Sequence, residues 1–239
     1  MLPSEIHHQI CQVCGDNAMS DGIACALTIL MRYHKEGDGI LSHIVTGDKT
    51  CVSHITPESK QQSLHWKHTS SPKRKKFKQM FSTRKITCTV FWDRRGVLLV
   101  EFLPQDTTVN PAVYCETLKK LKLAIQNKRC QMLSATVLLL HDNAQPHSAA
   151  GTQDLITSFK WEHMDHPLYS PDLVPSAYHL FLHLKKFLGS KRFDDDDDLK
   201  DAVQKWLTSQ AAASCEEGIQ KLVPRYDKCL NNGSEYVEK

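Results

Sequence analysis

The sequence predicts an α/β fold whose sheet contains both parallel and antiparallel strands and is flanked by helices. In the first half, two β-branched and aromatic segments lie on either side of a turn, which is typical of an antiparallel hairpin. In the second half, short apolar segments alternate with amphipathic ones, which is typical of parallel strands joined by helices. The 239 residues suffice for one large domain, or for one domain with a short appendage.

The first elements that we expect precede the hairpin. Residues 23–43 carry apolar side chains at helical spacing and predict a connecting helix. Residues 44–45 and 51–52 are apolar and flank a segment that contains Gly47, so this stretch could form an early strand. The hairpin itself is predicted by residues 86–103, with a turn at Asp93-Arg94-Arg95-Gly96.

Alternating elements follow. Residues 114–125 predict an amphipathic helix, and the all-apolar residues 137–140 predict a central strand that is buried on both faces. We then expect a helix over 149–159, a short strand near 161–164 and a helix over 178–188. A final amphipathic helix is marked by Leu199, Val203, Trp206 and Leu207, and the acids Asp194 to Asp198 lie at its positive N-terminal end.

The net charge of +3 excludes no class of function, because the basic residues are unevenly distributed. Residues 60–85 contain no acid, and residues 73–76 are four consecutive cations that must be solvated. Phosphate contacts by such a segment need no specific base sequence. The basic residues that we expect to contact nucleic acid are Lys73, Arg74, Lys75, Lys76, Lys78, Arg84 and Lys85.

Cysteine usage and hydropathy favour an intracellular protein with reduced thiols. The nine cysteines are odd in number and irregular in spacing, no signal peptide is evident, and the apolar stretch 22–31 is too short to span a membrane. Cys11-x-x-Cys14 is weak support for zinc, because no second pair follows at a suitable spacing. The other cysteines are interpreted as small apolar core residues: Cys25, Cys51, Cys88, Cys115, Cys130, Cys215 and Cys229.

Two carboxylates lie where predicted strands end, namely Asp48 and Asp142. Ligands bind at strand ends in open α/β sheets, and paired acids suit a divalent metal ion such as Mg²⁺. The alternative is that each acid caps a turn or a helix. His141 and His147 flank Asp142 and could position it.

Several motifs resemble, in the right order, those of the mariner family of DNA transposases. They are Thr46-Gly47-Asp48, Val90-Phe91-Trp92-Asp93, His141-Asp142-Asn143-Ala144-Gln145-Pro146-His147, Tyr169-Ser170-Pro171-Asp172-Leu173 and the ending from Gly218 to Lys239. The resemblance implies an RNase H-like fold, a retroviral-integrase-like catalytic core with a mixed sheet flanked by helices. It also implies cut-and-paste DNA transposition, in which three aspartates hold two Mg²⁺ or Mn²⁺ ions for DNA cleavage and strand transfer.

Carried over residue by residue, the resemblance places the first two acids on Asp48 and Asp142. The third family position, after thirty-four intervening residues, is Ala177, whose methyl group cannot hold a metal. Asp172, five residues earlier, is the possible substitute ligand, although it belongs to a different motif. Lys49 stands where the family has an acid and would oppose cation binding, and Gln145 stands where an arginine is common.

The resemblance also organises the chain into regions. Residues 1–22 resemble the start of a helix-turn-helix and are expected to be its remnant, residues 23–43 the connecting helix, and residues 44–239 the catalytic domain of a shortened, mutated copy. DNA is the implied partner, with non-specific duplex binding more expected than recognition of transposon ends. A homodimer and nuclear location are also implied, and no membrane association.

The expected function is therefore that of a mariner-like transposase whose cleavage activity is lost through Ala177. The alternative is a non-catalytic DNA-binding or interaction protein that keeps the fold as a scaffold. Salt-dependent binding to arbitrary duplex, lost when residues 73–76 are neutralised, would favour the alternative.

Overall fold

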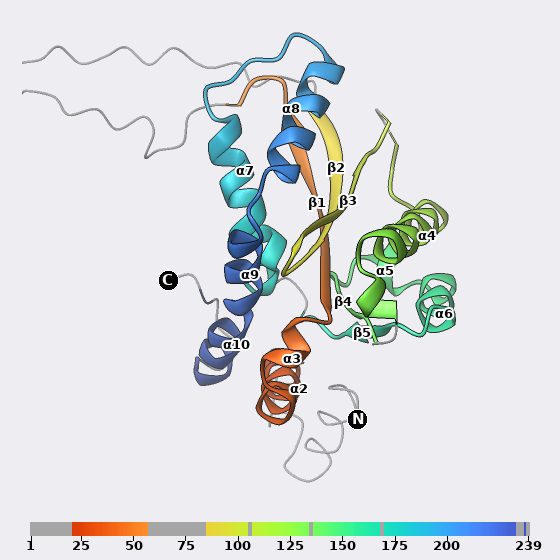
Figure 1. Ribbon diagram of the computed structural model, residues 1–239, viewed down its shortest axis with the longest axis vertical. Helices are drawn as coiled ribbons and strands as arrows, with labels where there is room; N and C mark the ends of the chain where they lie inside the picture. The colour runs from red at the N-terminus through yellow and green to blue at the C-terminus, as the bar shows by residue number, and fades with distance from the viewer. Residues whose placement is uncertain are drawn as a thin grey trace, which may run out of the picture.

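A computed structural model describes residues 21–56, 85–104, 107–133, 136–167, 170–232 and 237, and it places one sheet between two groups of helices (Figure 1). The strands are β1 (Ile44–Ser53), β2 (Lys85–Asp93), β3 (Gly96–Phe102), β4 (Leu138–Leu140) and β5 (Glu162–Met164). Their order across the sheet is β3-β2-β1-β4-β5. β1, β2 and β3 are antiparallel neighbours, whereas β1, β4 and β5 run parallel, so the predicted mixed sheet is confirmed.

β1 is one continuous strand, and Gly47 lies near its middle opposite Phe91 of β2. A Cβ atom at Gly47 would lie 2.1 Å from Cε1 of Phe91, so a side chain cannot be added there without moving the ring. The glycine therefore lets β1 pass close to a buried aromatic residue immediately before Asp48.

Helices cover both faces of this sheet. They are α2 (Asp21–Glu36), α3 (Asp38–Leu41), α4 (Pro111–Lys128), α5 (Gln145–Ser148), α6 (Ala150–Ser158), α7 (Phe181–Leu188), α8 (Asp196–Thr208), α9 (Ala212–Gln220) and α10 (Leu222–Asn231). Short turns of 3₁₀ helix occur at Cys130–Leu133 and Pro171–Leu173, and a π-helical turn at Ser176–Leu180 leads into α7. None of the helices in the described ranges is long and apolar enough to cross a membrane.

Two buried clusters hold the layers together, one on each face of the sheet. On one face, α4 and α6 pack against Val45, Phe91 and Leu139. On the other face, helices α7 to α10 and α2 cover the sheet, and Trp92 and Leu140 are part of their shared core (Figure 1). Successive residues of a strand, such as Phe91 and Trp92, thus pack into different cores, because neighbouring side chains of a strand point to opposite faces of the sheet.

The helices differ from the prediction in two places. The predicted connecting helix breaks at Gly37, whose φ of 62° separates α2 from α3. The helix marked by Leu199 is α8 and is not the last, because α9 and α10 follow it. The missed signal is a helical spacing of buried residues: Cys215, Ile219, Leu222, Tyr226 and Cys229.

The acidic run and the cysteines also have definite places. Asp195 caps α8 by accepting a hydrogen bond from the Asp198 amide at 2.7 Å, which confirms the acids at the start of that helix. The prediction that the cysteines fill the core is wrong for Cys51 and Cys130, which are exposed. Cys51 is on β1, where alternate side chains point away from the core.

Candidate active site

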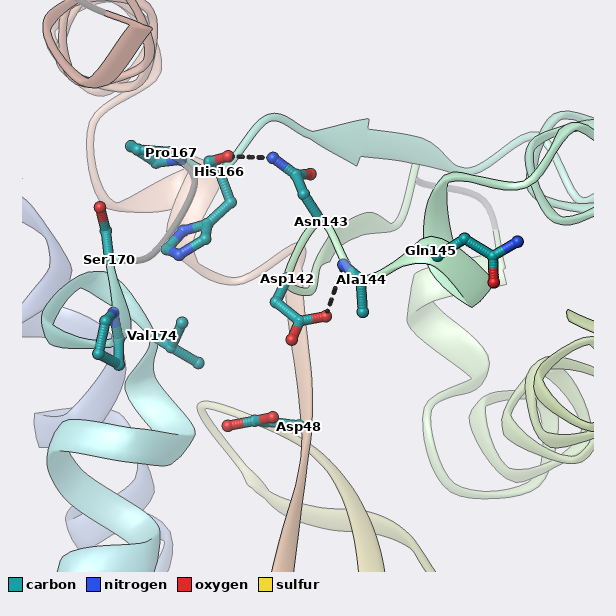
Figure 2. A pocket seen from close by; sticks show the side chains of 10 residues that line it. Asp48, Asp142, Asn143, Ala144, Gln145, His166, Pro167, Ser170 and Val174 are labelled. Carbon is teal, nitrogen blue, oxygen red and sulfur yellow. Dashed lines mark hydrogen bonds between the residues drawn. The ribbon is translucent and has the colours of Figure 1, made fainter. Parts of the chain in front are cut away.

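The pairing of β1 with β4 brings Asp48 and Asp142 to one cavity. Thr46 lies opposite Leu140 in this parallel pair, and each aspartate is two residues further along its own strand direction. The two side chains therefore emerge on the same face of the sheet, where β4 ends beside the middle of β1. The cavity between them has a volume of about 450 Å³ (Figure 2). Its lining residues are Asp48, Asp142, Asn143, Ala144, Gln145, His166, Pro167, Ser170, Pro171 and Val174.

Asp48 is largely desolvated in this cavity. Burial raises the pKa of its carboxyl group to about 6, and the neighbouring negative charge of Asp142 adds to that rise. The backbone amide of Lys49 opposes the shift by donating to Oδ1 of Asp48 at 2.6 Å. The Lys49 side chain is exposed, and its charge lowers the pKa of Asp48 only weakly.

Asp142 has the opposite electrostatic environment. His147 Nδ1 lies 2.5 Å from Oδ1 of Asp142, and this hydrogen bond is the main reason that the pKa of Asp142 falls to about 2. The Ala144 amide donates to the same oxygen at 3.3 Å. The ring of His147 is in turn 4.0 Å from that of Tyr114, centroid to centroid. Asp142 is therefore ionised at neutral pH and held in a defined position.

The two carboxylates fit one divalent cation. Two acids of adjacent strands share a cavity, and the negative charge of Asp142 raises the cost of ionising Asp48, a cost that a bound cation would remove. A third protein ligand is not brought to them: within the described ranges, no group of three or more His, Cys, Asp or Glu side chains is arranged to hold a metal ion. The predicted catalytic and metal-binding roles remain predictions.

Ala177, the expected third position, is in the π-helical turn Ser176–Leu180, which packs against β1. Figure 2 shows the Asp48 carboxylate extending from its strand toward the helical segment that follows Val174. The amide of Ala177 donates to the carbonyl of Val174 at 2.9 Å. The turn thus packs against the strand that carries Asp48. Ala177 is not itself among the cavity-lining residues, and its side chain is a methyl group without a metal-binding atom.

Asp172, the possible substitute, has another partner. It is buried in the turn Pro171–Leu173, and its Oδ2 accepts a hydrogen bond from the Val237 amide at 2.8 Å. Arg225 Nη1 donates to the Asp172 carbonyl at 2.7 Å. Asp172 is absent from the cavity lining, although Pro171 and Val174 on either side of it belong to that lining.

Sequence reasoning missed His166 as a lining residue. It follows β5, so it reaches the same sheet edge as Asp142, and its carbonyl accepts a hydrogen bond from the Asn143 side chain. Its position directly after the short strand 162–164 is the signal that could have found it.

The predicted nucleic-acid-binding residues are largely outside the described ranges, which include none of Lys73 to Lys78 and not Arg84. Lys85 is described: it is exposed and begins β2, opposite Ser53. Cys11 and Cys14 also lie outside the described residues, and so does the expected helix-turn-helix remnant up to residue 20.

Comparison with known proteins identifies relatives along most of the chain. Residues 56–135 match the family described as "Transposase (partial DDE domain)". The Mariner Mos1 transposase of Drosophila mauritiana is 34% identical over 216 residues, which are 88% of this chain and 60% of that protein. Human histone-lysine N-methyltransferase SETMAR is 30% identical over 212 residues, which are 88% of this chain but 30% of that protein. The chain thus spans less than two thirds of either relative.

Solved structures agree with this relationship. The Mos1 paired-end complex with Mn matches with a TM-score of 0.82 at 32% identity, covering 90% of this chain and 62% of that one. The crystal structure of the catalytic domain of Mos1 matches with a TM-score of 0.74 at 30% identity, covering 90% of this chain and 93% of that domain. The expected RNase H-like fold is confirmed. The chain therefore belongs to the mariner family of transposases and corresponds to the catalytic domain of that family.

Proposed function

We propose that this chain is a mariner-type catalytic domain that no longer cleaves DNA, because its metal site has two carboxylates instead of three. The observation that carries the proposal is Ala177, located in the turn beside β1 toward which Asp48 extends. An alanine offers no oxygen to a cation, and a metal site tolerates little displacement of a substitute ligand. Asp172 does not compensate, because it is buried outside the cavity lining, where its Oδ2 accepts from the Val237 amide.

Asp48 and Asp142 would hold one Mg²⁺ or Mn²⁺ ion. Structures of the Mos1 paired-end complex with Mn and with Mg support this choice of metal. Such an ion would polarise a phosphodiester oxygen and lower the pKa of a bound water. The chain's own residues prepare the site unequally: His147 keeps Asp142 ionised, whereas burial disfavours the ionised form of Asp48.

DNA is the proposed partner. Mos1 forms a paired-end complex with its left transposon end, and this supports a DNA-facing role for the related domain here. The basic segment 60–85 would contact phosphates without reading sequence, so affinity should fall steeply with salt. Binding of DNA without cleavage, with the fold as a scaffold, is the second candidate function, and the same basic segment favours it. A nuclear location and a homodimer belong to this proposal.

A nicking assay on supercoiled plasmid with Mn²⁺ tests the proposal and avoids any need for matching transposon ends. The same assay on a duplex that carries such ends adds the specific reaction. We expect no nicking by the native chain and a gain of nicking by Ala177→Asp. Adding Asp142→Asn to that variant should abolish the gain, because it removes one of the remaining ligands.

Robust nicking by the native chain that Asp142→Asn abolishes would overturn the loss of activity. Duplex binding, measured by fluorescence anisotropy over 50–200 mM salt, tests the partner separately. Neutralising Lys73 to Lys76 should weaken binding and flatten its salt dependence, since fewer counterions are released.

A further inference from the structure

A buried hydrogen bond joins β2 to the turn that carries residue 177. Nε1 of Trp92 donates to Oγ of Ser176 at 2.9 Å, and both residues are essentially without exposed surface. Ser176 immediately precedes Ala177. A polar pair in a dry core is directional, and losing one partner leaves the other unsatisfied.

The two residues after Ala177 are held as well. Tyr178 Oη donates to the carbonyl of Gly218 at 2.8 Å, and His179 Nε2 donates to the carbonyl of Ser214 at 2.9 Å. Both acceptors are on α9. The turn is therefore attached on one side of residue 177 to the sheet and on the other side to a helix.

Close packing of α9 against Trp92 and His179 restricts these contacts further. A Cβ atom at Gly218 would lie 2.6 Å from Cδ2 of His179 and 2.8 Å from Cη2 of Trp92. The Trp92 and His179 rings are stacked, with centroids 6.3 Å apart. Trp92 thus contacts the turn at Ser176, stacks on His179 of the same turn, and lies close to Gly218 of α9.

The backbone of the turn is itself unusual. The Phe181 amide donates to the carbonyl of Ser176, five residues back, so that the turn is π-helical. Single π-helical turns are rare and occur frequently at functional sites, because they shift the side chains that they carry. Here the shifted segment is the one that contains residue 177.

The geometry points to Trp92 as a positioning residue, which through Ser176 fixes the π-helical turn so that the side chain of residue 177 is presented to Asp48 and Asp142. This inference rests on the proposed function, because it concerns the third ligand position of the same site. The hydrogen bonds that hold the turn around residue 177 are present in this chain, although residue 177 itself carries no carboxylate. Trp92 touches neither metal nor DNA in this role and acts only through the turn.

The test uses Mn²⁺ affinity in two backgrounds, measured on the full chain from the loss of the free Mn²⁺ resonance signal. Ala177→Asp should bind Mn²⁺ more tightly than the native chain. Trp92→Phe keeps an aromatic ring but removes the N–H donor, and in the Ala177→Asp background it should weaken Mn²⁺ binding about tenfold. In the native background Trp92→Phe should leave Mn²⁺ affinity unchanged, since residue 177 there contributes nothing.

Matched variants separate positioning from general damage. Trp206→Phe, a tryptophan stacked on Phe187 at 5.7 Å, should leave the gain of Ala177→Asp intact. Ser176→Ala, which removes the acceptor with almost no change in volume, should reproduce the effect of Trp92→Phe. Full retention of the gain in Trp92→Phe/Ala177→Asp, or an equal loss in both backgrounds, would overturn the inference.

A second readout is independent of metal. Hydrogen exchange at the amides of Ala177 and Phe181 should be faster in Trp92→Phe than in the native chain, because the turn loses its attachment to β2. Unchanged exchange there would overturn the positioning role. Nicking by the native chain would instead contradict the proposed loss of activity, so the two failures are distinguishable.

Discussion

The Asp172 carboxylate accepts a hydrogen bond from the backbone amide of Val237 at 2.8 Å, across sixty-five residues of sequence. Both residues are buried, and Lys228 Nζ donates to the Val237 carbonyl at 2.7 Å. The Asp172 carboxylate therefore attaches Val237 to the turn Pro171–Leu173, which borders the cavity.

Asp172→Ala should destabilise the fold without changing Mn²⁺ affinity. The variant leaves a buried amide unpaired, which costs about 1–3 kcal/mol in the free energy of unfolding. Urea unfolding and Mn²⁺ titration measure the two effects. Asp201→Ala removes an exposed carboxylate 4.0 Å from Lys205 and should change stability by less than about 0.5 kcal/mol. Weaker Mn²⁺ binding by Asp172→Ala at unchanged stability would identify Asp172 as a ligand after all.

Asp48→Asn should stabilise the metal-free chain at pH 8 and leave it unchanged near pH 4. The folded-state pKa of Asp48, about 6, lies above the unfolded value of about 3.9, so the folded state holds its proton longer. Stability from this group is present below the unfolded pKa and is lost as pH rises through the folded pKa. Thermal melts at both pH values, in EDTA, should show a Tm rise of about 2–4 °C at pH 8 only. Asp154→Asn, which changes an exposed carboxylate on α6, is the control. A lower Tm of Asp48→Asn than of the native chain at pH 8 would contradict the raised pKa of Asp48.

Arg129→Ala should be strongly destabilising, because it leaves the buried carboxylate of Asp93 without its cation. Arg129 Nε lies 2.6 Å from Oδ2 of Asp93, whose side chain is 2% exposed. Removing one partner of such a pair costs about 3–5 kcal/mol. The double variant Asp93→Ala/Arg129→Ala should lose less than the sum of the single losses in urea unfolding. Additive losses would show that the pair is not coupled.

Gly47→Ala should lower stability by about 3 kcal/mol, since its Cβ would overlap the Phe91 ring. Gly151→Ala is the matched control: no atom lies within 4 Å of its Cβ position in α6, and alanine favours helix by about 1 kcal/mol. The midpoints of urea unfolding should therefore move in opposite directions. Adding Phe91→Leu should recover part of the stability lost in Gly47→Ala, because the smaller side chain makes room for the methyl group. Equal urea midpoints for Gly47→Ala and Gly151→Ala would contradict the close contact between Gly47 and Phe91.

Local patterns predicted most of the fold. The hairpin, α4, α6 and the short strands were predictable because each depends on nearby side chains and on a period of two or 3.6 residues. The run 215–229 has the same helical spacing and was missed, because Gly218 and Pro224 interrupt its appearance as a helix. The break at Gly37 was missed for a related reason: a single φ of 62° is a backbone choice that a glycine permits but does not require.

The site was predictable only in part. Asp142 was placed correctly just after a strand, whereas the prediction that Asp48 ends a strand is wrong, because β1 continues past it to Ser53. The parallel register of β1 with β4 then brought the two aspartates together. His166 was not anticipated, because the strand that precedes it, β5, has only three residues and therefore shows little periodic pattern. The opposite pKa shifts of the two aspartates could not be predicted either, since they depend on burial and on where His147 lies.

By itself the sequence determined which chemical groups are available: the carboxylates of two aspartates, and at residue 177 a methyl group, which cannot ligate a metal in any fold. The tertiary structure alone decided which groups meet. It forms a hydrogen bond between Asp172 and Val237 and an ion pair between Asp93 and Arg129. It also joins Trp92 to Ser176 by a hydrogen bond across eighty-four residues of sequence. Such contacts depend on packing between segments that are distant in the chain, and no local pattern of residues encodes which of them will lie side by side.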